Sequence, residues 1–323
     1  MPSCPEINPA SPLLFVINAA SGSNQVEVKR QAIEQTLQAG GRTGELLFCQ
    51  PGELEPVARQ AAARALATRT AVVAVGGDGT LNAVAQAAHA IGCPMGVIAQ
   101  GTFNYFARTH VLPVEPAEAT RVLLTSQPVP VQVAAVNDRV FLVNASLGLY
   151  PDLLEDRERY KSRFGRSRWV ALGAAFVTMM GTQRRLNLRI THGGKVREVH
   201  TLTLFVGNNR LQLEQVGVPP DARIAGTPGA GSVAAVMLRP IGALAMCRLL
   251  LRGALGTLGE DDSVERFEFS QLLVRPSIGH GRRRIKIAYD GEVNWMRGPI
   301  LFQVLPEPLY LLKPAELKGA PAE

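Results

Sequence analysis

The stretch that decides the fold is AVVAVGGDGTLNAVAQAA, residues 71–88. Its apolar, β-branched beginning, Ala71–Val75, predicts a buried strand, and the glycine-rich loop Gly76–Thr80 follows directly. After the loop, apolar residues recur at helical spacing from Leu81 to Ala88, which predicts a helix. Strand, loop and helix in this order form part of a βαβ unit, the building block of a parallel sheet.

The same alternation extends outward over the N-terminal part of the chain. Helical patterns such as Ala32–Leu37 lie between further short apolar runs. Those further predicted strands are Leu13–Ile17, Leu46–Cys49 and Met95–Ile98. Repeated βα alternation predicts a Rossmann-like α/β domain with a parallel sheet.

Polar, glycine-containing loops follow three of these strands, at Asn18–Ser23, Gly76–Thr80 and Gln100–Asn104. Because parallel strands end at one edge of a sheet, we expect the loops to meet in a single crevice there. Glycines let backbone N–H groups approach phosphate oxygens, a helix N-terminus favours negative charge, and Ser and Thr hydroxyls add donors. Three such loops at one edge predict a phosphate-binding site, whereas one alone would be explained by a tight turn.

A carboxylate, that of Asp78, lies in the middle of the second loop. It would repel phosphates unless a divalent cation or an acceptor proton lay between them, so the loop implies Mg²⁺ with Asp78 as a ligand. Neither G-x-G-x-x-G nor G-x-x-x-x-G-K-[ST] occurs in the chain. Their absence argues against a dinucleotide oxidoreductase and a P-loop NTPase.

Length and pattern predict two domains. The chain has 323 residues, more than one hydrophobic core usually organises. Beyond about Pro128 the pattern changes to successive strands, such as Leu186–Thr191 and Val196–Val206 joined by a turn at His192–Gly194. We therefore expect a mostly antiparallel second domain.

Composition excludes several classes of protein. Four cysteines, far apart in the sequence, predict neither a disulfide framework nor a zinc site, and a reducing cytoplasm fits this usage. No run predicts a transmembrane helix, and the start of the chain shows no secretory signal. The formal charge of +7 predicts attraction to polyanions, whether nucleic acid, anionic lipid headgroups or nucleotide phosphates.

A fourth candidate element lies far downstream, at Ile285–Glu292. Alternation places Tyr289 on one face of a strand and Lys286 with Asp290 on the other. Asp290-Gly291 between two strands is a strong hairpin signal, so by itself this pattern predicts a turn. A functional role for this turn is indicated only by its presence together with the three glycine-containing loops.

Taken together, these segments resemble the diacylglycerol kinase catalytic-domain family, which includes soluble bacterial lipid kinases and sphingosine kinases and is more distantly similar to NAD kinases. The resemblance is carried by Gly76–Asn82, Gly101–Ala107 and Asp290–Glu292, with support from Asn18–Gly22, Asn144–Gly148 and Val206–Asn209. It implies an α/β nucleotide-binding domain and a β-sandwich-like lipid-substrate domain. The implied domains are 1–130 with a C-terminal return at 300–323, and 131–299.

The resemblance also implies roles for individual residues. An ATP site would be lined by Asn18, Ser21, Gly22, Gly76, Gly77, Asp78, Gly79, Thr80, Asn82, Gly101, Thr102 and Asn104. Asp290 or Glu292 would accept the proton of the attacking hydroxyl, and Asp78 would help to hold Mg²⁺. The implied reaction is ATP-dependent phosphorylation of a lipid hydroxyl in phospholipid metabolism, with diacylglycerol as the leading acceptor and a sphingoid-type or other lipid alcohol as the alternative.

Several positions depart from the family pattern. Ala19 replaces a loop proline, Ala83 stands where many members carry glutamate, and Asp221–Gly226 lacks the D-G pair of a second magnesium site. Two alternatives therefore stay open: a NAD kinase, whose family shares a G-G-D-G loop, and a nucleotide- and lipid-binding module without turnover. Gly101–Ala107 and the distal Asp-Gly-Glu favour the lipid branch over NAD kinase.

The predicted membrane contact is the basic segment Arg157–Trp169. Its Lys and Arg side chains would meet anionic headgroups, while Phe164 and Trp169 would lie at the interface. The alternative is a solvated helix with its apolar side in the core. We expect a cytoplasmic protein, peripherally associated with the membrane, that binds a lipid substrate and no nucleic acid.

Overall fold

The computed structural model describes residues 4–18, 23–50, 52–101, 103–148, 151, 186–208, 231–241, 263–276 and 284–314. These residues form two compact units. The first unit comprises the described residues of Met1–Val133 and Leu305–Glu323, and the second those of Ala134–Gly226 and Ala230–Val304.

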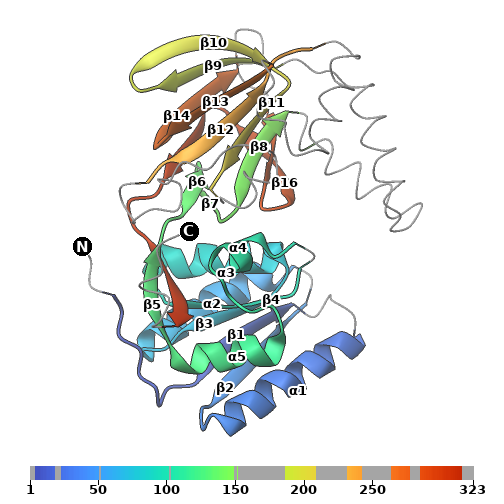
Figure 1. Cartoon of the computed structure of the whole chain (residues 1–323), viewed down its shortest axis with the longest axis vertical. Helices are drawn as coiled ribbons and strands as arrows, with labels where there is room; N and C mark the ends of the chain where they lie inside the picture. The colour runs from blue at the N-terminus through green and yellow to red at the C-terminus, as the bar shows by residue number, and fades with distance from the viewer. Residues whose placement is uncertain are drawn as a thin grey trace. The chain divides into compact units, whose positions relative to one another are not determined.

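The first unit is a layered α/β structure (Figure 1). Its strands are β1 (Leu13–Asn18), β2 (Gly44–Cys49), β3 (Val72–Gly76), β4 (Met95–Ala99), β5 (Ser126–Val131) and β18 (Leu309–Pro314). Its helices are α1 (Ser23–Ala39), α2 (Leu54–Ala67), α3 (Asp78–Ile91), α4 (Tyr105–Thr109) and α5 (Pro116–Thr125). The six-stranded sheet has the order β2-β1-β3-β4-β18-β5, parallel from β2 to β18, with β5 antiparallel at the edge.

Helices cover both faces of this sheet (Figure 1). α1 lies beside α5, and Ile33, Leu37 and Leu123 from these two helices join Phe15 of β1 in one buried cluster. α2 lies beside α3, and both contact β1 and β3. The central strands β3 and β4 are buried along their whole length, as expected for parallel strands enclosed by helices. The predicted α/β fold of the N-terminal domain is confirmed.

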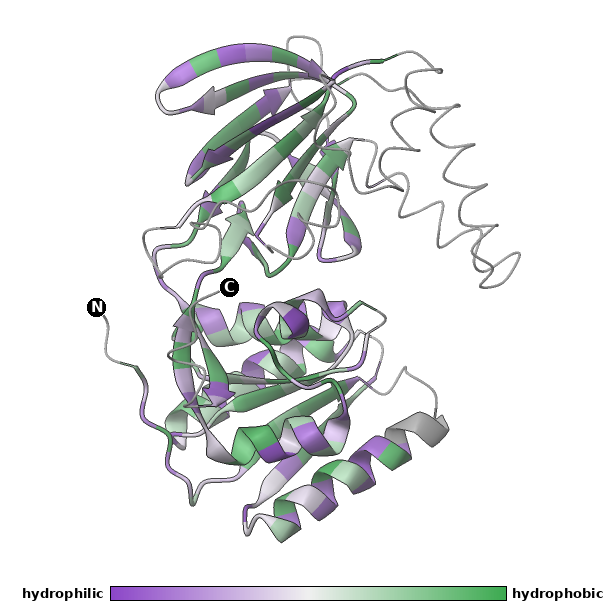
Figure 2. Cartoon of the chain, in the orientation of Figure 1, coloured by the Kyte–Doolittle hydropathy of each residue, from purple (hydrophilic) through white to green (hydrophobic). Residues whose placement is uncertain are grey.

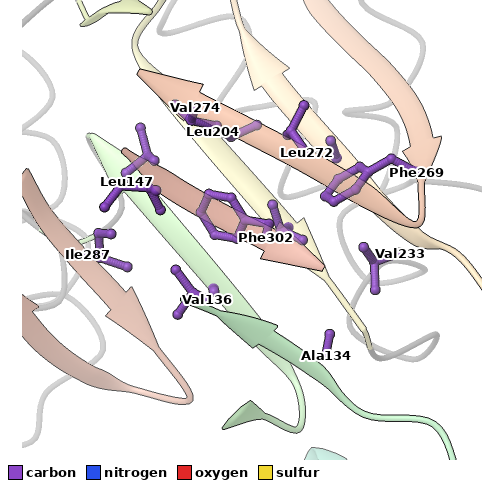
Figure 3. Packing of buried hydrophobic residues seen from close by; sticks show 14 of the residues in the cluster. Ala134, Val136, Leu147, Leu204, Val233, Phe269, Leu272, Val274, Ile287 and Phe302 are labelled. Carbon is purple, nitrogen blue, oxygen red and sulfur yellow. The ribbon is translucent and has the colours of Figure 1, made fainter. Parts of the chain in front are cut away.

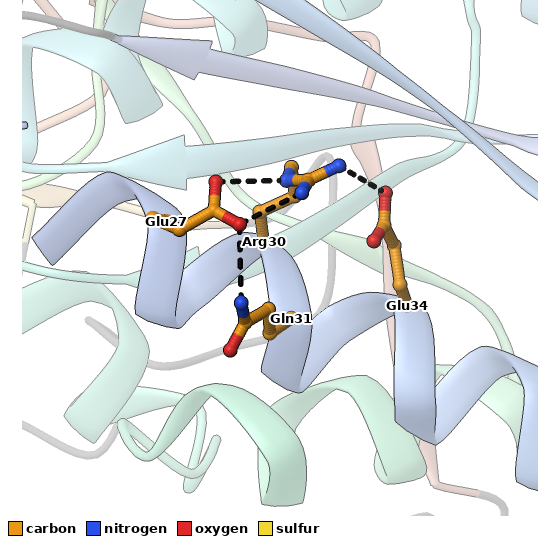
Figure 4. Close-up of polar contacts among 4 residues, drawn as sticks. All are labelled: Glu27, Arg30, Gln31 and Glu34. Carbon is orange, nitrogen blue, oxygen red and sulfur yellow. Dashed lines mark hydrogen bonds and ion pairs between the residues drawn. The ribbon is translucent and has the colours of Figure 1, made fainter. Parts of the chain in front are cut away.

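Helix α1 shows how the sequence separates a buried from an exposed side. It carries both hydrophobic and hydrophilic residues (Figure 2). On its exposed side, Arg30 donates hydrogen bonds to Glu27 over 2.7 Å and to Glu34 over 3.4 Å (Figure 4). Exposed pairs one turn apart stabilise a helix by only about 0.3–0.5 kcal/mol each. The burial of Ile33 and Leu37 therefore contributes more to holding α1 on the sheet.

The second unit consists of two six-stranded sheets. Its strands are β6 (Ala134–Val136), β7 (Arg139–Phe141), β8 (Asn144–Gly148), β9 (Leu186–His192), β10 (Lys195–Thr201), β11 (Thr203–Gly207), β12 (Val233–Leu238), β13 (Val264–Phe269), β14 (Gln271–Pro276), β15 (Arg284–Tyr289), β16 (Glu292–Arg297) and β17 (Ile300–Val304). The orders are β10-β9-β14-β17-β6-β7 and β13-β12-β11-β8-β15-β16, with antiparallel pairing. The predicted antiparallel fold is confirmed.

The two sheets of this unit share one hydrophobic core (Figure 3). Leu147, Leu204 and Ile287 come from one sheet, whereas Val274 and Phe302 come from the other. All five side chains are fully or almost fully buried. Packing of two inner sheet faces against each other is the β-sandwich arrangement that the family resemblance implies.

One predicted segment is divided in the structure. Val196–Val206 forms β10 and β11, because the Thr201 hydroxyl bonds to backbone oxygens, among them that of Thr203, and interrupts the strand. The C-terminal part of the described chain forms β17 and β18, with Pro306 and Pro308 between them. β17 pairs with β14 and β6, so 300–304 lie in the second unit, although the predicted C-terminal return began at 300. None of the helices in the described part of the chain is long and apolar enough to span a membrane.

Candidate active site

Two of the predicted phosphate loops meet at the carboxyl ends of β3 and β4. The backbone N–H of Gln100 donates to the carbonyl oxygen of Gly76 over 2.7 Å. A Cβ placed on Gly101 would lie 3.5 Å from the Cα of Gly77 and 3.6 Å from Oδ2 of Asp78. The parallel register of the two strands thus brings their loops into contact.

The third loop begins at Asn18, which ends β1, the neighbour of β3 on its other side. Asn18 therefore lies at the same edge of the sheet. The other two residues predicted from that loop, Ser21 and Gly22, lie outside the described residues, as do Thr102 and the segment Arg157–Trp169.

The N-terminus of α3 faces the space between the loops. Gly77 is the N-cap, with an extended backbone (φ −79°, ψ −175°), and as a glycine it has no side chain to cap the helix. The first N–H groups of a helix have no acceptor within the helix, so Asp78, Gly79 and Thr80 present backbone donors. The positive end of the helix dipole adds to their affinity for an anion. This geometry suits phosphate oxygens.

Thr80 fixes the turn from β3 into α3. Its side chain is only 3% exposed. A Cβ on Gly76 would lie 2.5 Å from the Thr80 Oγ1, so the residue before the turn must be glycine. The Thr80 hydroxyl therefore packs inward, and Asn82, at 8% exposure, is buried in α3 as well. Both residues are among those expected to line the ATP site, and that role stays a prediction.

The environment of Asp78 changes the pKa of its carboxyl group. Its side chain is partly buried, and burial raises the pKa of the carboxyl above its ordinary value. Burial disfavours the charged form because it removes hydration, and a bound cation would stabilise the charged carboxylate. Mg²⁺ is usually bound by one or two carboxylates together with substrate phosphates. Asp78, beside loops of phosphate-binding type, fits this pattern.

Asn104 shapes the second loop. It has a left-handed backbone (φ +51°) at the N-cap of α4, a conformation that asparagine tolerates better than most residues. Its Oδ1 accepts a hydrogen bond from the backbone N–H of Gly101 over 2.8 Å. A Cβ on Gly101 would lie only 3.0 Å from the same oxygen. Asn104 thus holds the turn that keeps Gly101 close to Gly77.

Sequence reasoning missed an aromatic pair in this loop. The rings of Phe103 and Tyr105 are stacked, with centroids 5.5 Å apart and planes 8° from parallel. Phe103 is exposed, and burial raises the pKa of the Tyr105 phenol. The signal was present as two aromatic residues on either side of Asn104 in an otherwise polar loop. The stack presents a flat apolar surface beside the candidate nucleotide site.

The distal carboxylates lie in the second unit, in the turn between β15 and β16. Asp290 and Gly291 have left-handed backbones (φ +44° and +87°), as a two-residue hairpin turn of type I′ requires. Asp290 is 5% exposed, whereas Glu292 is exposed at the start of β16. The turn predicted from the sequence is present, but its two carboxylates have different environments.

These features define a class of protein: a layered α/β domain with glycine-containing loops at one sheet edge, followed by a β-sandwich. Residues 12–136 match the family model of the diacylglycerol kinase catalytic domain. The resemblance predicted from the loops is confirmed, and residues 12–136 are similar to diacylglycerol kinase catalytic domains.

Relatives extend the similarity beyond that segment. The chain is 29% identical over 165 residues to "Probable lipid kinase YegS-like" of Serratia proteamaculans, covering 49% of this chain and 52% of the relative. It is 28% identical over 253 residues to "Putative lipid kinase SERP0390" of Staphylococcus epidermidis, covering 75% and 76%. It is 28% identical over 156 residues to "Diacylglycerol kinase" of Staphylococcus carnosus, covering 47% and 50%. Two of these alignments thus span about half the length of the relative.

Solved structures share the whole fold. A diacylglycerol kinase of Bacillus anthracis superposes with a TM-score of 0.64 at 18% identity, covering 94% of this chain and 97% of that one. Another structure described as a putative diacylglycerol kinase of the same species gives a TM-score of 0.69 at 17% identity, covering 94% and 98%. At this identity the likeness concerns the fold alone.

Proposed function

We propose that this protein is an ATP-dependent lipid kinase that transfers the γ-phosphate to a lipid hydroxyl, with diacylglycerol as the acceptor. The observation that carries the proposal is the contact between the Gly77–Asp78 and Gly101 loops at the N-terminus of α3. A helix N-terminus with glycine as its N-cap, together with glycine loops, suits phosphates, and one partly buried carboxylate suits the metal that accompanies them. The family match of residues 12–136 supports a kinase rather than another phosphate-binding protein.

Phosphoryl transfer depends mainly on positioning of the reactants and on neutralisation of the phosphate charge, and little on covalent catalysis by the protein. Backbone N–H groups at Gly77–Thr80 would hold the ATP phosphates. Asp78 would hold Mg²⁺, which supplies neutralisation of the phosphate charge. A carboxylate from the Asp290–Glu292 turn would accept the proton of the lipid hydroxyl as its oxygen attacks the γ-phosphorus and ADP leaves.

An enzyme that phosphorylates a membrane lipid must contact the bilayer, and one surface of the described residues is suited to such contact. The outer face of the β15–β16 hairpin carries Arg284 opposite Arg297 and Lys286 opposite Trp295. Trp295 is 56% exposed, and the Lys286 ammonium lies 5.5 Å from its ring centroid. Like charges directly opposite one another are destabilising unless an anion offsets them. We call this surface of Arg284, Lys286, Trp295 and Arg297 the hairpin face; its cations suit anionic lipid headgroups, and its tryptophan suits the membrane interface. Membrane contact through Arg157–Trp169 stays a prediction.

The test compares acceptors. Purified protein with Mg²⁺ and ATP is assayed for ADP release with diacylglycerol in mixed micelles, with a sphingoid base, and with NAD. The proposal expects phosphatidic acid to form with diacylglycerol at a rate well above the other two. Turnover only with NAD would favour the NAD kinase alternative, and ATP binding without turnover on any lipid would favour the binding module.

A further inference from the structure

Three apolar side chains of the segment that follows β4 are exposed, although the segment is anchored in the first unit. Phe103 is 42% exposed, Val114 45% and Val111 68%. Phe106 and Leu112 of the same segment are buried. The segment thus separates its apolar residues into an inner and an outer set. We call the outer set, Phe103, Val111 and Val114, the apolar rim.

The apolar rim lies at the same edge of the sheet as the glycine-containing loops. The segment leaves β4 at its carboxyl end, where the backbone N–H of Gln100 donates to the oxygen of Gly76 over 2.7 Å. Its far end returns to this point, because Nε2 of Gln100 donates to the carbonyl oxygen of Val114 over 3.1 Å. Compact loops with close ends frequently have a function. The fold therefore holds the apolar rim beside the candidate site.

Val111 is an unusual residue for its position. It follows α4 with a left-handed backbone (φ +55°). Its N–H donates to the oxygen of Arg108 over 3.1 Å, and the N–H of Leu112 donates to the oxygen of Ala107 over 2.8 Å. In this Schellman arrangement the left-handed residue is usually glycine, and a β-branched side chain is strained there. In water, glycine would remove both the strain and the exposed apolar surface, so the valine suits a chain in which something apolar covers it.

The composition of the segment favours a lipid surface as that cover. Residues 103–114 contain no aspartate or glutamate, and Arg108 is their one lysine or arginine. Phe103 is stacked on Tyr105, whose ring ends in a polar hydroxyl. Exposed apolar residues with an aromatic pair, a cation and no carboxylate are typical of surfaces that meet the interface of a bilayer.

The area of the apolar rim argues against a second copy of the chain as the cover. A large aromatic side chain buries only about 150–250 Å², so three partly exposed side chains bury on the order of a few hundred Å². A specific protein interface buries about 800 Å² on each partner. Apolar side chains that enter a bilayer need no matching surface, because the acyl chains adapt to them.

We propose that the apolar rim is a membrane-insertion element, which docks the first unit on a bilayer beside the glycine-containing loops. It brings the candidate site to an acceptor that stays in the membrane. That the acceptor is a lipid rests on the proposed function, whereas the insertion does not. The hairpin face belongs to the second unit and acts through its charges, but the apolar rim acts through apolar contact. Salt and headgroup charge therefore distinguish the two surfaces.

The test uses variants of the full chain: Val111→Gly, Val114→Ser and the double variant, with Ile91→Ser as the matched control. Ile91 is 42% exposed, like Phe103, and ends α3, the helix that starts at the carboxyl end of β3, so it lies toward the opposite edge of the sheet. Partition onto neutral phosphatidylcholine vesicles is measured by sedimentation at low and high salt. Tm is measured in parallel. The kcat/KM is determined with long-chain diacylglycerol in these vesicles and with short-chain diacylglycerol below its micellar concentration.

The rim variants are expected to lose membrane contact but not folding. Partition onto neutral vesicles should fall about fivefold in each single variant and more than tenfold in the double variant, at both salt concentrations. Tm of Val111→Gly should not fall, because glycine relieves the left-handed backbone. The kcat/KM with vesicle lipid should fall in parallel with partition, while that with monomeric lipid stays unchanged. Ile91→Ser should match the natural protein throughout.

A gain of signal gives an independent measurement. An indole that enters the acyl region emits at shorter wavelength, so Val111→Trp should show a blue shift when neutral vesicles are added. Ile91→Trp should show no such added shift. A shift of equal size in both proteins, or none in Val111→Trp, would contradict insertion.

Several results would overturn the proposal. These are absence of the natural protein from sedimented neutral vesicles, unchanged partition of the double variant, and equal loss in Ile91→Ser. An equal fall of kcat/KM with monomeric lipid would show that the segment serves the reaction and not the membrane. A dimer that dissociates in the double variant, with vesicle partition unchanged, would make a second copy the partner. If the natural protein phosphorylates neither lipid, the proposed function fails, whereas partition and fluorescence still decide the apolar rim.

Discussion

Gly76 and Gly77 are neighbours in the sequence, but they are glycine for different reasons. A Cβ on Gly76 would overlap the Thr80 side chain, at 2.5 Å from Oγ1 and 2.7 Å from Cβ. A Cβ on Gly77 would meet nothing closer than the Gly101 Cα at 3.8 Å, an ordinary contact, and would extend into the space between the loops. The first glycine is needed by the fold, whereas a Cβ at the second would meet no close contact.

This difference predicts opposite results for two equal substitutions. Gly76→Ala should destabilise the first unit by about 1–3 kcal/mol, the usual cost of overpacking, with a clear loss in Tm. Gly77→Ala should keep Tm but weaken Mg·ATP binding about tenfold or more, since one charge-assisted hydrogen bond is worth about 1.5–3 kcal/mol. Thermal unfolding and ATP titration of both proteins check this. Equal effects on Tm and on affinity would contradict the assignment.

Among the elements, the β15–β16 hairpin carries both the turn and the face that the proposed function uses. Its turn carries Asp290 and Glu292, and its outer face carries Trp295 with three cationic residues of β15 and β16. Docking of the hairpin face on a bilayer would hold the turn close to the headgroup region. Such an arrangement suits an enzyme whose acceptor hydroxyl lies at the membrane surface.

Membrane binding through the hairpin face is testable with two substitutions. Trp295→Ala and Arg297→Glu should each lower the fraction bound to vesicles with anionic lipid, the second by several-fold, because a cation near such a surface contributes about 1 kcal/mol. Lys195→Glu, an equal charge reversal at an exposed site on β10, is the matched control. Sedimentation with anionic and neutral vesicles measures the effect. Binding unchanged in both variants would rule out the hairpin face.

At the scale of the whole molecule, the chain leaves the first unit after β5 and returns to it with β18. β18 pairs antiparallel with β5 over six residues and parallel with β4 at Leu311. Leu309, Leu311 and Leu312 are almost completely buried. The sheet of the first unit is therefore completed only by the last described strand of the chain.

Truncation tests how much the first unit depends on this return. A chain ending at Val304 loses three buried leucines, each worth about 1.5–3 kcal/mol, against a total stability of about 5–15 kcal/mol. We expect it to aggregate or to lose the increase in Tm that Mg·ATP produces in the full chain. A chain ending at Pro314 keeps β18 and is the control. A chain ending at Val304 with undiminished ATP-induced stabilisation would contradict this prediction.

Much of the first unit was predictable because its signals are local. The strand and loop at Ala71–Thr80 are adjacent in the sequence, and parallel pairing requires such loops to lie at one edge. The turn at Asp290-Gly291 was also local, since only a few residue pairs tolerate two left-handed backbones in succession. The same reasoning missed the interruption at Leu202 and the inward position of Thr80, because both depend on neighbours that periodicity does not specify.

The sequence by itself determined the α/β and antiparallel character of the two parts, the phosphate-type loops and the family resemblance. These follow from local spacing of apolar residues and glycines, which each segment carries regardless of its surroundings. Only the tertiary structure decided that Asp290 binds the peptide groups of Leu142–Asn144 while Glu292 stays exposed. The partners of that carboxylate are 146 to 148 residues away along the chain, and folding alone brings them within hydrogen-bonding distance.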